Sequence, residues 1–327
     1  MDTDSAAIAP LLNGVARLSG WGVVRVSGED AASFLHHQLT QDFLLLDASE
    51  ARLAALCSAK GRMLASFIGI KRSPQELLLL CSQDILAATV KRLSMFVLRA
   101  KVKLNDATAE FSLFGLAGDA ISSIATGAEN TWARVDFDTE IAVFLYPAMG
   151  QARVLYLAPA GSVPASLAAF APMDEALWLW SEVRSGVATL TQPVVDAFVP
   201  QMLNYESVGG VSFQKGCYPG QEVVARSQFR GSLKRRASLL HSEQILQPGQ
   251  EIFADLTQGA APSDAQPCGV VVQVAAAPGG GYDAIVCLQT AVLTAAPSAT
   301  LPELSVPAAQ VEVLRHLALP YALRDDL

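Results

Sequence analysis

The stretch Lys215-Gly-Cys-Tyr-Pro-Gly-Gln-Glu222 is the most informative segment of this 327-residue chain, because it is polar and turn-rich inside a sequence that is 51% hydrophobic. Gly216 and Gly220 allow the backbone to turn tightly and to approach a ligand closely. Cys217 lies two residues from Lys215, and a cation that close favours the reactive thiolate. We therefore predict an exposed, functional thiol at Cys217 assisted by Lys215, although a lone cysteine is more often a small buried hydrophobe.

Positive charge is concentrated just downstream of this stretch. Five cations fall within eleven residues, namely Arg226, Arg230, Lys234, Arg235 and Arg236. The whole chain carries a formal net charge of −8, so the cluster predicts a local anion site for carboxylates or phosphates, with a basic patch over its last four members. The alternative interpretation is an ordinary solvated face.

Amino-acid composition limits the classes of protein to which this chain can belong. With 51% hydrophobic and 17% charged residues, the chain has ample apolar material for two or three packed subdomains. It opens with Met1-Asp-Thr-Asp-Ser and has no Lys or Arg before Arg17, which is unlike a secretory or mitochondrial leader. It also has no uninterrupted apolar run of about 18 residues, the length that a transmembrane helix needs. We expect a cytoplasmic protein without membrane contact.

The cysteines are scattered at Cys57, Cys81, Cys217, Cys268 and Cys287. No Cys-x-x-Cys pair is present, so the sequence predicts neither a zinc ribbon nor a stable iron–sulfur cluster. An odd number of cysteines fits reduced thiols in a cytosol.

Hydrophobic patterning predicts a mixed α+β protein rather than a regular βαβ alternation. Strands are expected at Trp21–Val26, Arg52–Cys57, Met63–Ile70, Glu76–Cys81, Phe111–Leu116, Ile141–Tyr146 and Arg153–Leu157. Helices are expected after Asp30, after Ser82 and from Asp174 to Gly186.

From Arg235 onward the pattern changes to short apolar runs divided by Pro- and Gly-rich loops, which is typical of a small antiparallel barrel or sandwich. These runs are Ala237–Leu240, Gly269–Val274, Asp283–Leu288 and Val311–Leu317. We place a domain boundary there, giving residues 1–235 and 236–327, and expect a surface loop at Ala295–Pro307.

The opening octapeptide closely resembles the signature of the YgfZ family, folate-binding relatives of the T-protein, the aminomethyltransferase of the glycine cleavage system. Pro200-Gln-Met-Leu-Asn204, Arg230-Gly-Ser-Leu-Lys-Arg235 and Leu319-Pro-Tyr-Ala-Leu323 also resemble the family. The resemblance runs from about Trp21 to the C-terminus.

This resemblance implies a GcvT-like fold with three subdomains around a central tetrahydrofolate cavity. Two interleaved α+β subdomains would make up residues 1–235, and a small antiparallel β-barrel would follow. Trp21 and Trp178 match the family's folate-binding tryptophans, with Trp180 as the nearest rival to the second and core packing as the alternative for each. Folate contacts are also expected from Gln201, Asn204, Tyr218, Gln221, Glu222 and Arg226.

The T-protein uses an aspartate shortly after a Gly-rich turn, and the matching turn here is Ser58-Ala-Lys-Gly-Arg62. Where the acid should follow, this chain has Ala65 and Ser66, and Arg52–Arg72 contains no acid. Neither side chain can serve as a general base or stabilise a cation. Classical aminomethyltransferase activity is therefore not expected.

The family role implied is assembly or repair of [4Fe–4S] proteins, with an indirect effect on tRNA modification. Cys217 would then be a transient cluster ligand, a persulfide carrier or a one-carbon acceptor, and the partners would be folate and iron–sulfur proteins or their assembly factors. Two alternatives stay open: a folate-dependent one-carbon transferase, and a tRNA-interacting modification factor acting through Arg226–Arg236. The net negative charge argues against direct binding of nucleic acid.

Overall fold

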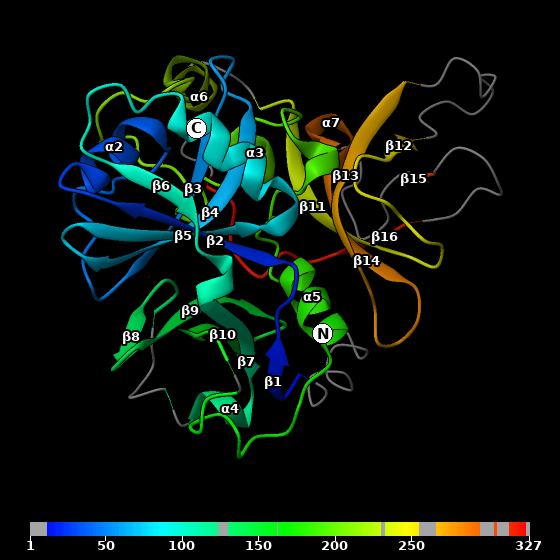
Figure 1. The fold of residues 1–327 in the computed structure, drawn as a ribbon. Coiled ribbons are helices and arrows are strands. Elements are labelled where there is room, and N and C mark those ends of the chain that lie inside the picture. The colour runs from blue at the N-terminus through cyan, green and yellow to red at the C-terminus, as the bar shows by residue number, and fades with distance from the viewer. Residues whose placement is uncertain are drawn as a thin grey trace.

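In a computed structural model, residues 12–122, 124, 130–161, 163–229, 233–254, 266–294, 304–305 and 314–324 are described. Arg230 and most of the loop expected at 295–307 lie outside these residues. The strands form three antiparallel sheets, which occupy three sides of the molecule in Figure 1.

The first sheet is built on the hairpins expected from the alternating apolar runs. Its strand order is β3 (Ala51–Cys57), β4 (Met63–Ser73), β5 (Glu76–Ser82), β2 (Trp21–Ser27) and β6 (Lys103–Asp106). Because side chains alternate across a strand, Leu77 and Leu79 of β5 face one core while Leu78 and Leu80 face another.

The second sheet begins with a strand that sequence patterning did not predict. Its order is β1 (Gly14–Arg17), β7 (Phe111–Ala117), β10 (Gln151–Pro159), β9 (Glu140–Ala148) and β8 (Arg134–Phe137). Since β1 belongs to this sheet and β2 to the first, the chain crosses between the two sheets within its first described residues. The α4 helix (Asp119–Ser122) follows β7, and the 3₁₀ turn η2 (Thr108–Glu110) precedes it.

The third sheet contains only strands from residue 235 onward. Its order is β15 (Leu304–Ser305), β12 (Glu251–Ala254), β13 (Pro267–Ala276), β14 (Tyr282–Gln289), β11 (Arg235–Ser242) and β16 (Arg315–Leu317), with β15 and β16 at its edges in the described residues. The short helix α7 (Thr290–Thr294) follows β14. The antiparallel third sheet and the mixed architecture confirm the predicted α+β fold class.

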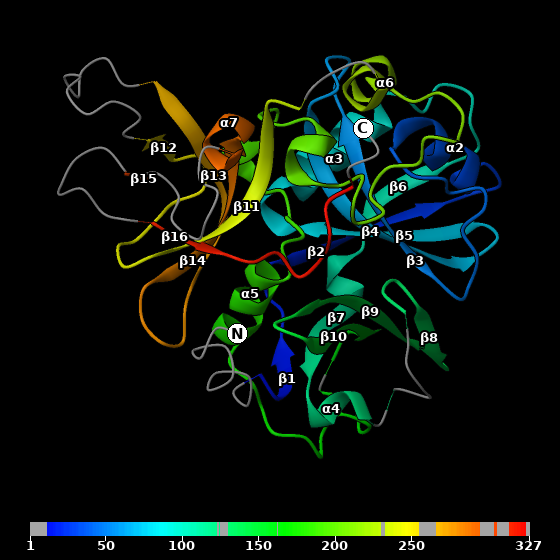
Figure 2. The ribbon, with the colours of Figure 1, turned by 180° about the vertical axis from the view of Figure 1, so that it is seen from behind.

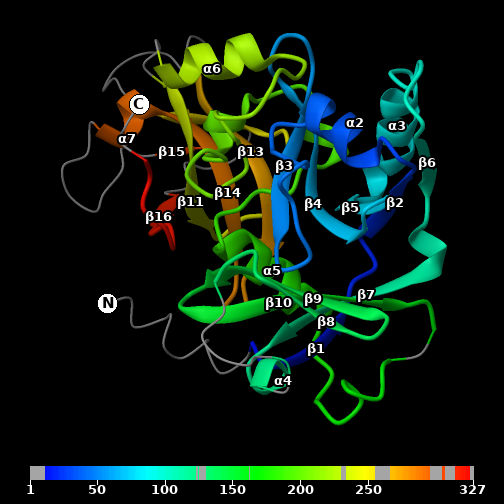
Figure 3. The ribbon, with the colours of Figure 1, turned by 90° about the vertical axis from the view of Figure 1, so that its left-hand side faces the viewer.

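Two helices cover the outer face of the first sheet. These are α2 (Ala31–Gln38) and α3 (Gln83–Ser94), whose buried Phe34, Leu35, Ile85 and Leu86 share a core with Leu79. The opposite face of the sheet is turned toward the second sheet, as Figure 3 shows. The space between these two sheets is where the cavity described below lies.

The helix α5 (Glu175–Arg184) lies where the three sheets meet, between β9 and β1 on one side and β13 and β14 on the other (Figures 1 and 3). Asp174 caps it as predicted, accepting a hydrogen bond from the Ala176 amide at 2.9 Å. Gly186 follows it with a φ of +68°, a conformation that glycine adopts without strain.

The chain after β16 returns to this junction, as the red segment in Figure 2 shows. The Tyr321 hydroxyl donates to the Gly186 carbonyl at 2.7 Å. The C-terminal segment therefore ties the third sheet to the end of α5. No helix in the described ranges is long and apolar enough to cross a membrane.

Candidate functional site

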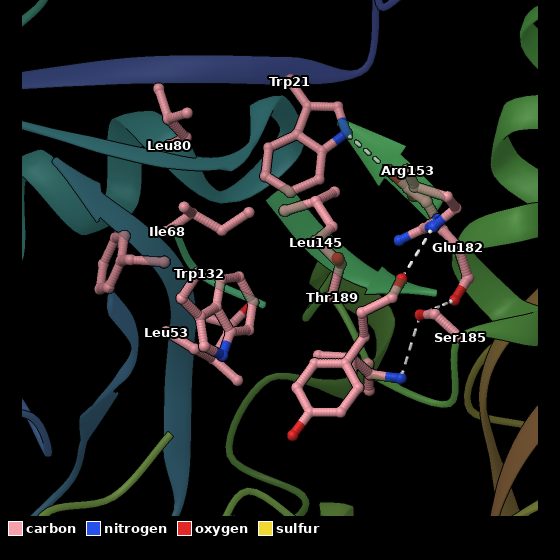
Figure 4. A pocket seen from close by; sticks show the side chains of 15 residues that line it. Trp21, Leu53, Ile68, Leu80, Trp132, Leu145, Arg153, Glu182, Ser185 and Thr189 are labelled. Atoms are coloured by element: carbon pink, nitrogen blue, oxygen red, sulfur yellow. Dashed lines mark hydrogen bonds between the residues drawn. The ribbon is translucent and has the colours of Figure 1, made fainter. Parts of the chain in front are cut away.

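A small cavity of about 30 Å³ lies between the first sheet, the second sheet and α5 (Figure 4). The first sheet supplies Trp21, Leu53, Ser66, Phe67, Ile68 and Leu80. The second sheet and the loop before it supply Trp132, Leu145, Tyr146 and Arg153. The helix α5 and the segment after it supply Glu182, Ser185, Val187, Ala188 and Thr189. One wall is thus apolar, and the opposite wall carries the charged groups.

The carboxylate of Glu182 is held by two tryptophans. Its Oε1 accepts hydrogen bonds from Trp21 Nε1 at 3.1 Å and from Trp178 Nε1 at 2.8 Å. Its Oε2 accepts none from the described residues, and Glu182 lines the cavity. Burial raises the pKa of Glu182, while Arg153 and the two indole donors act in the opposite direction. The arrangement presents a fixed hydrogen-bond acceptor to the cavity.

The guanidinium of Arg153 forms part of the same polar wall. It donates to the Tyr146 carbonyl at 3.1 Å and to Ser181 Oγ at 3.0 Å, and it stacks on the Trp178 ring at 4.9 Å from its centroid. Burial lowers the pKa of Arg153 to about 10, and Glu182 acts in the opposite direction. Glu182 and Arg153 are therefore buried groups of opposite charge on the same wall, and their charges interact without an ion-pair contact between the two side chains.

Ala65 and Ser66, which stand where the T-protein acid is expected, lie on opposite faces of β4. Ser66 of β4 lines the cavity, whereas Ala65 points to the opposite face and packs under the outer helices. Ser66 Oγ accepts a hydrogen bond from the Leu190 amide at 2.8 Å. Glu182 is thus the only acidic side chain among the described residues that line the cavity.

Trp132 separates this cavity from a second, more polar opening. Its indole Nε1 donates to the Val208 carbonyl at 3.1 Å, and its ring makes an edge contact with Tyr146. On its other side lies a groove with a volume of about 490 Å³, lined by Gln41, Asp42, Leu45, Glu50, Ala51, Arg52, Thr131, Gly209, Ser212 and Gln214 as well as Trp132. The central cavity therefore has an aromatic partition toward this outer groove.

Cys217 lies at the surface, away from the central cavity, and is the one exposed cysteine of the five. Lys215 is buried instead: its Nζ donates to the carbonyls of His36 and Leu39, the latter at 2.9 Å, and lies over the Tyr218 ring. Carbonyls at the end of a helix lack intrahelical partners, and a lysine satisfies them well. Burial lowers the pKa of Lys215 to about 8, with Asp42 and Cys217 acting in the opposite direction. Through these bonds, Lys215 anchors its loop at the end of α2, and the same loop exposes Cys217 at the surface.

The loop is also held by a contact between two glycines. Gly220 has a φ of +79°, and a Cβ placed on it would lie 2.7 Å from the Cα of Gly61 in the β3–β4 turn. Gly61 itself has a φ of +70°. The two turns pack backbone to backbone, which explains why both positions are glycine.

Replacing Gly220 by alanine should therefore destabilise the fold more than the backbone angle alone predicts. Gly150 is a matched control, because its φ is +76° but nothing lies within 4 Å of the position that a Cβ would occupy. We expect Gly150→Ala to cost about 1 kcal/mol and Gly220→Ala at least about 2 kcal/mol more, measured by urea unfolding. Equal losses for the two variants would show that the close approach is unimportant.

Two residues predicted to contact folate make buried hydrogen bonds to other elements, Gln201 to α6 (Gln221–Phe229) and Asn204 to β11 of the third sheet. Gln201, in the 3₁₀ turn η4 (Pro200–Leu203), donates to the Val224 carbonyl at 2.7 Å. Asn204, with a left-handed φ of +59°, donates to the Ala237 carbonyl at 2.9 Å. A second 3₁₀ turn, η3 (Gln192–Val194), precedes this segment.

Arg236 is buried beside Asn204 rather than part of a surface patch. Its guanidinium donates to Glu206 Oε1 at 2.9 Å and to Asn204 Oδ1 at 3.2 Å, and the side chains of Arg236 and Glu206 are 10% and 0% exposed. Lys234 is exposed and Arg235 is half-buried. The predicted cluster of cations is thus divided between the surface and the interior.

The remaining predicted residues lie outside the cavity lining. Trp178 is fully buried behind the cavity wall, and Trp180 is buried against the third sheet, where it donates to Asp283 Oδ2 at 2.7 Å. Tyr218 belongs to the core that includes Leu53. Gln221, Glu222 and Arg226 lie on a helix that sequence patterning missed, α6 (Gln221–Phe229), with Glu222 and Arg226 exposed. Of the residues expected to contact folate, Trp21 alone lines the cavity.

Sequence reasoning missed Trp132, Tyr146, Arg153 and Glu182. Glu182 did leave a signal, because it follows Trp178 by four positions in a predicted helix and so lies on the same face. Tyr146 and Arg153 gave no such signal in the sequence, because they reach the cavity only through the way in which the two sheets pack together. In the described part of the chain, no group of three or more His, Cys, Asp or Glu is placed to hold a metal ion.

The chain is similar to known proteins over most of its length, although no family model matches it. The tRNA-modifying protein YgfZ of Edwardsiella ictaluri is 35% identical, covering 67% of this chain and 68% of that protein. Proteins of the same name from Colwellia psychrerythraea and Cronobacter sakazakii are 32% and 30% identical, covering 71% and 76% of this chain and 72% and 77% of their own lengths.

Among solved structures, aminomethyltransferase T of the glycine cleavage system from Bartonella henselae matches with a TM-score of 0.66 at 15% identity. The match covers 97% of this chain and 89% of that chain. This likeness shows a T-protein-like fold. Together with the curated relatives, it places the chain in a family: the protein belongs to the YgfZ family.

Proposed function

We propose that this protein binds a reduced folate in the central cavity and supports iron–sulfur enzymes through Cys217, including enzymes that modify tRNA. The observation that carries the folate part is the Glu182 carboxylate, whose Oε1 is fixed by two indoles while the residue lines an aromatic cavity. The T-protein-like fold and the family membership support the same assignment.

The residue types present suit a reduced pterin ring, and the walls must move apart to admit it, because the cavity volume of about 30 Å³ holds about one water molecule. The ring is flat and carries N–H donors along one edge, so it requires aromatic or apolar faces and an acceptor at its rim. Trp21 and Trp132 supply faces, and Glu182 supplies the acceptor (Figure 4). Tyr146 lines the same cavity and adds a third aromatic ring. When bound, the folate would supply a one-carbon unit or a reducing ring. The chain's part is to orient that ring and to exclude water from it.

Replacing Glu182 by glutamine tests this assignment. The glutamine carbonyl can still accept both indole bonds, but its amide group presents a donor to the cavity in place of an acceptor. A hydrogen bond to a charged group contributes about 1.5–3 kcal/mol, so tetrahydrofolate should bind roughly 10- to 100-fold more weakly. Isothermal titration calorimetry of the purified protein with tetrahydrofolate measures the change in dissociation constant.

Glu222→Gln is the matched control, because Glu222 is exposed on α6 and does not line the cavity. It should leave the cavity unchanged. If tetrahydrofolate fails to bind the unaltered protein, or binds Glu182→Gln as tightly, the folate assignment is wrong. Equal weakening by both variants would place the ligand elsewhere.

The iron–sulfur part of the proposal is supported by family resemblance and by the exposure of Cys217. An exposed thiol on a loop fixed by Lys215 is accessible to another protein, whereas the cavity is enclosed by three structural elements. The name of the relatives, tRNA-modifying protein, supports a link to tRNA modification. We infer that enzymes which modify tRNA and carry [4Fe–4S] clusters are among the clients.

One-carbon transfer to tetrahydrofolate is the alternative supported by the fold. Against it, β4 offers Ser66 where an acid is needed, and the hydroxyl of Ser66 is already bound to the Leu190 amide. Release of ammonia from an aminomethylated carrier protein would establish the transferase instead. Its absence, together with tight folate binding, agrees with the non-enzymatic role.

A further inference from the structure

The end of α3 and the segment that leads into β6 combine positive charge with exposed apolar side chains; we call residues 91–103 the α3–β6 surface. The sequence has no Asp or Glu between Asp84 and Asp106. The exposed cations of this surface are Lys91, Arg92, Arg99, Lys101 and Lys103. In a chain of net charge −8, this stretch is strongly positive.

Three apolar side chains lie exposed among these cations. Met95 is 67% exposed, Phe96 41% and Leu98 86%. The buried contacts of α3 are made by other residues, including Ile85, Leu86 and Leu93. Single exposed apolar side chains are ordinary, but three within four consecutive positions are characteristic of an interaction site.

Most of the cations are free to meet a partner. Lys101 pairs with Glu29 at 2.7 Å, and both of these side chains are largely exposed. In the described ranges, no acidic group lies within ion-pair distance of Lys91, Arg92, Arg99 or Lys103. The positive charge of the α3–β6 surface is therefore not neutralised within the chain.

We propose that the α3–β6 surface docks a client protein through an acidic segment that also carries apolar side chains. Protein interfaces combine an apolar centre with a polar rim and are enriched in Arg, Met and aromatic residues, as this surface is. The rim cations would steer an acidic partner and fix its orientation. RNA fits less well, because Phe96 is the one aromatic ring among the three exposed apolar side chains, whereas single-stranded RNA is bound by aromatic rings on which successive bases stack.

The position of the surface relative to Cys217 supports a client. At the N-terminal end of α2, the Lys101 amide donates to Asp30 Oδ2 at 2.7 Å; at the C-terminal end, Lys215 binds the Leu39 carbonyl at 2.9 Å. An eight-residue helix is about 12 Å long. A typical interface buries about 800 Å² on each partner and so extends further than that. The α3–β6 surface and the loop of Cys217 are thus attached to opposite ends of one short helix, a separation that a single interface can span.

Site-specific photo-crosslinking in living cells tests the docking. A photoreactive phenylalanine replaces Leu98 in the full chain, and the same probe at Ile245, which is 63% exposed beside the exposed Glu243, is the control position. We expect a protein adduct from position 98 that survives ribonuclease and is much weaker from position 245. Mass spectrometry of the adduct should find a contact peptide with net negative charge.

Charge reversal makes the test specific. Arg99→Glu should lower the adduct yield about tenfold through like-charge repulsion, whereas Arg17→Glu changes the net charge equally at an exposed position on β1 and should not. Reversing the acids of the contact peptide should restore the adduct with Arg99→Glu. No adduct at position 98, an adduct removed by ribonuclease, a contact peptide that is not acidic, or equal yields for the two charge reversals would overturn the proposal.

The docking proposal rests on the proposed function, because it assumes a client protein, but the two proposals are tested by different measurements. Arg99→Glu should bind tetrahydrofolate as tightly as the unaltered protein, because Arg99 is exposed and does not line the cavity. If folate does not bind but the charge-dependent adduct forms, the proposed function fails and the docking surface stands. If folate binds and the adduct is absent, the docking proposal fails and the proposed folate binding stands.

Discussion

Replacing Cys217 by serine is expected to abolish support of [4Fe–4S] enzymes under oxidative stress, to the level of cells that lack the protein. Serine has nearly the same shape, but its hydroxyl is not a nucleophile or a metal ligand at neutral pH, whereas a thiol is both. The measurement is the activity of a [4Fe–4S] dehydratase in cells that carry the variant as their only copy. Full activity would show that the thiol is structural.

The purified protein supplies the control for this variant. Cys57, Cys81, Cys268 and Cys287 are buried, and burial raises the pKa of the Cys57, Cys81 and Cys287 thiols to about 12. A thiol reagent should therefore modify the native protein at Cys217 alone, and the Cys217→Ser protein hardly at all. The variant should keep its unfolding midpoint and its affinity for tetrahydrofolate, since Cys217 does not line the cavity.

Replacing Arg236 by alanine should destabilise the fold by about 3–5 kcal/mol, because it leaves the buried carboxylate of Glu206 without its partner. It also removes a hydrogen bond to Asn204 Oδ1 and one to the Arg324 carbonyl at 3.2 Å. Urea unfolding measures the loss, and Lys234→Ala, at an exposed position two residues earlier, should change stability by no more than about 0.5 kcal/mol. A loss below about 1 kcal/mol for Arg236→Ala would mean that water or another cation solvates Glu206.

Local patterns predicted the fold where a segment's own residues decide its structure. The apolar run at Glu76–Cys81 became β5, and Asp174 began α5 by capping it. The strand β1 was missed because Gly14–Arg17 is short and gains its partner, β7, from about a hundred residues away. The helix α6 was missed because the polar segment after Gly220 was interpreted as part of a ligand-binding loop.

Among the residues that line the cavity, the sequence pointed to Trp21 but not to Arg153 or Glu182. Trp21 was predicted because it matches a folate-binding tryptophan of the family that the sequence resembles. Arg153 is a single cation in an apolar strand, and only the meeting of β10 with α5 brings it beside Glu182. Lys215 was interpreted by its closeness to Cys217 in sequence, but a buried ammonium needs acceptors, and the end of α2 supplies them.

The sharing of one carboxylate oxygen by two indoles has a spectroscopic consequence. Trp178 does not line the cavity, yet its Nε1 bonds the same Glu182 oxygen as Trp21 does. Any change in the charge or position of that carboxylate alters the surroundings of both rings at once. The fluorescence of Trp178 is therefore a remote optical reporter of cavity occupancy, and quenching of its emission is not by itself proof that a ligand touches it.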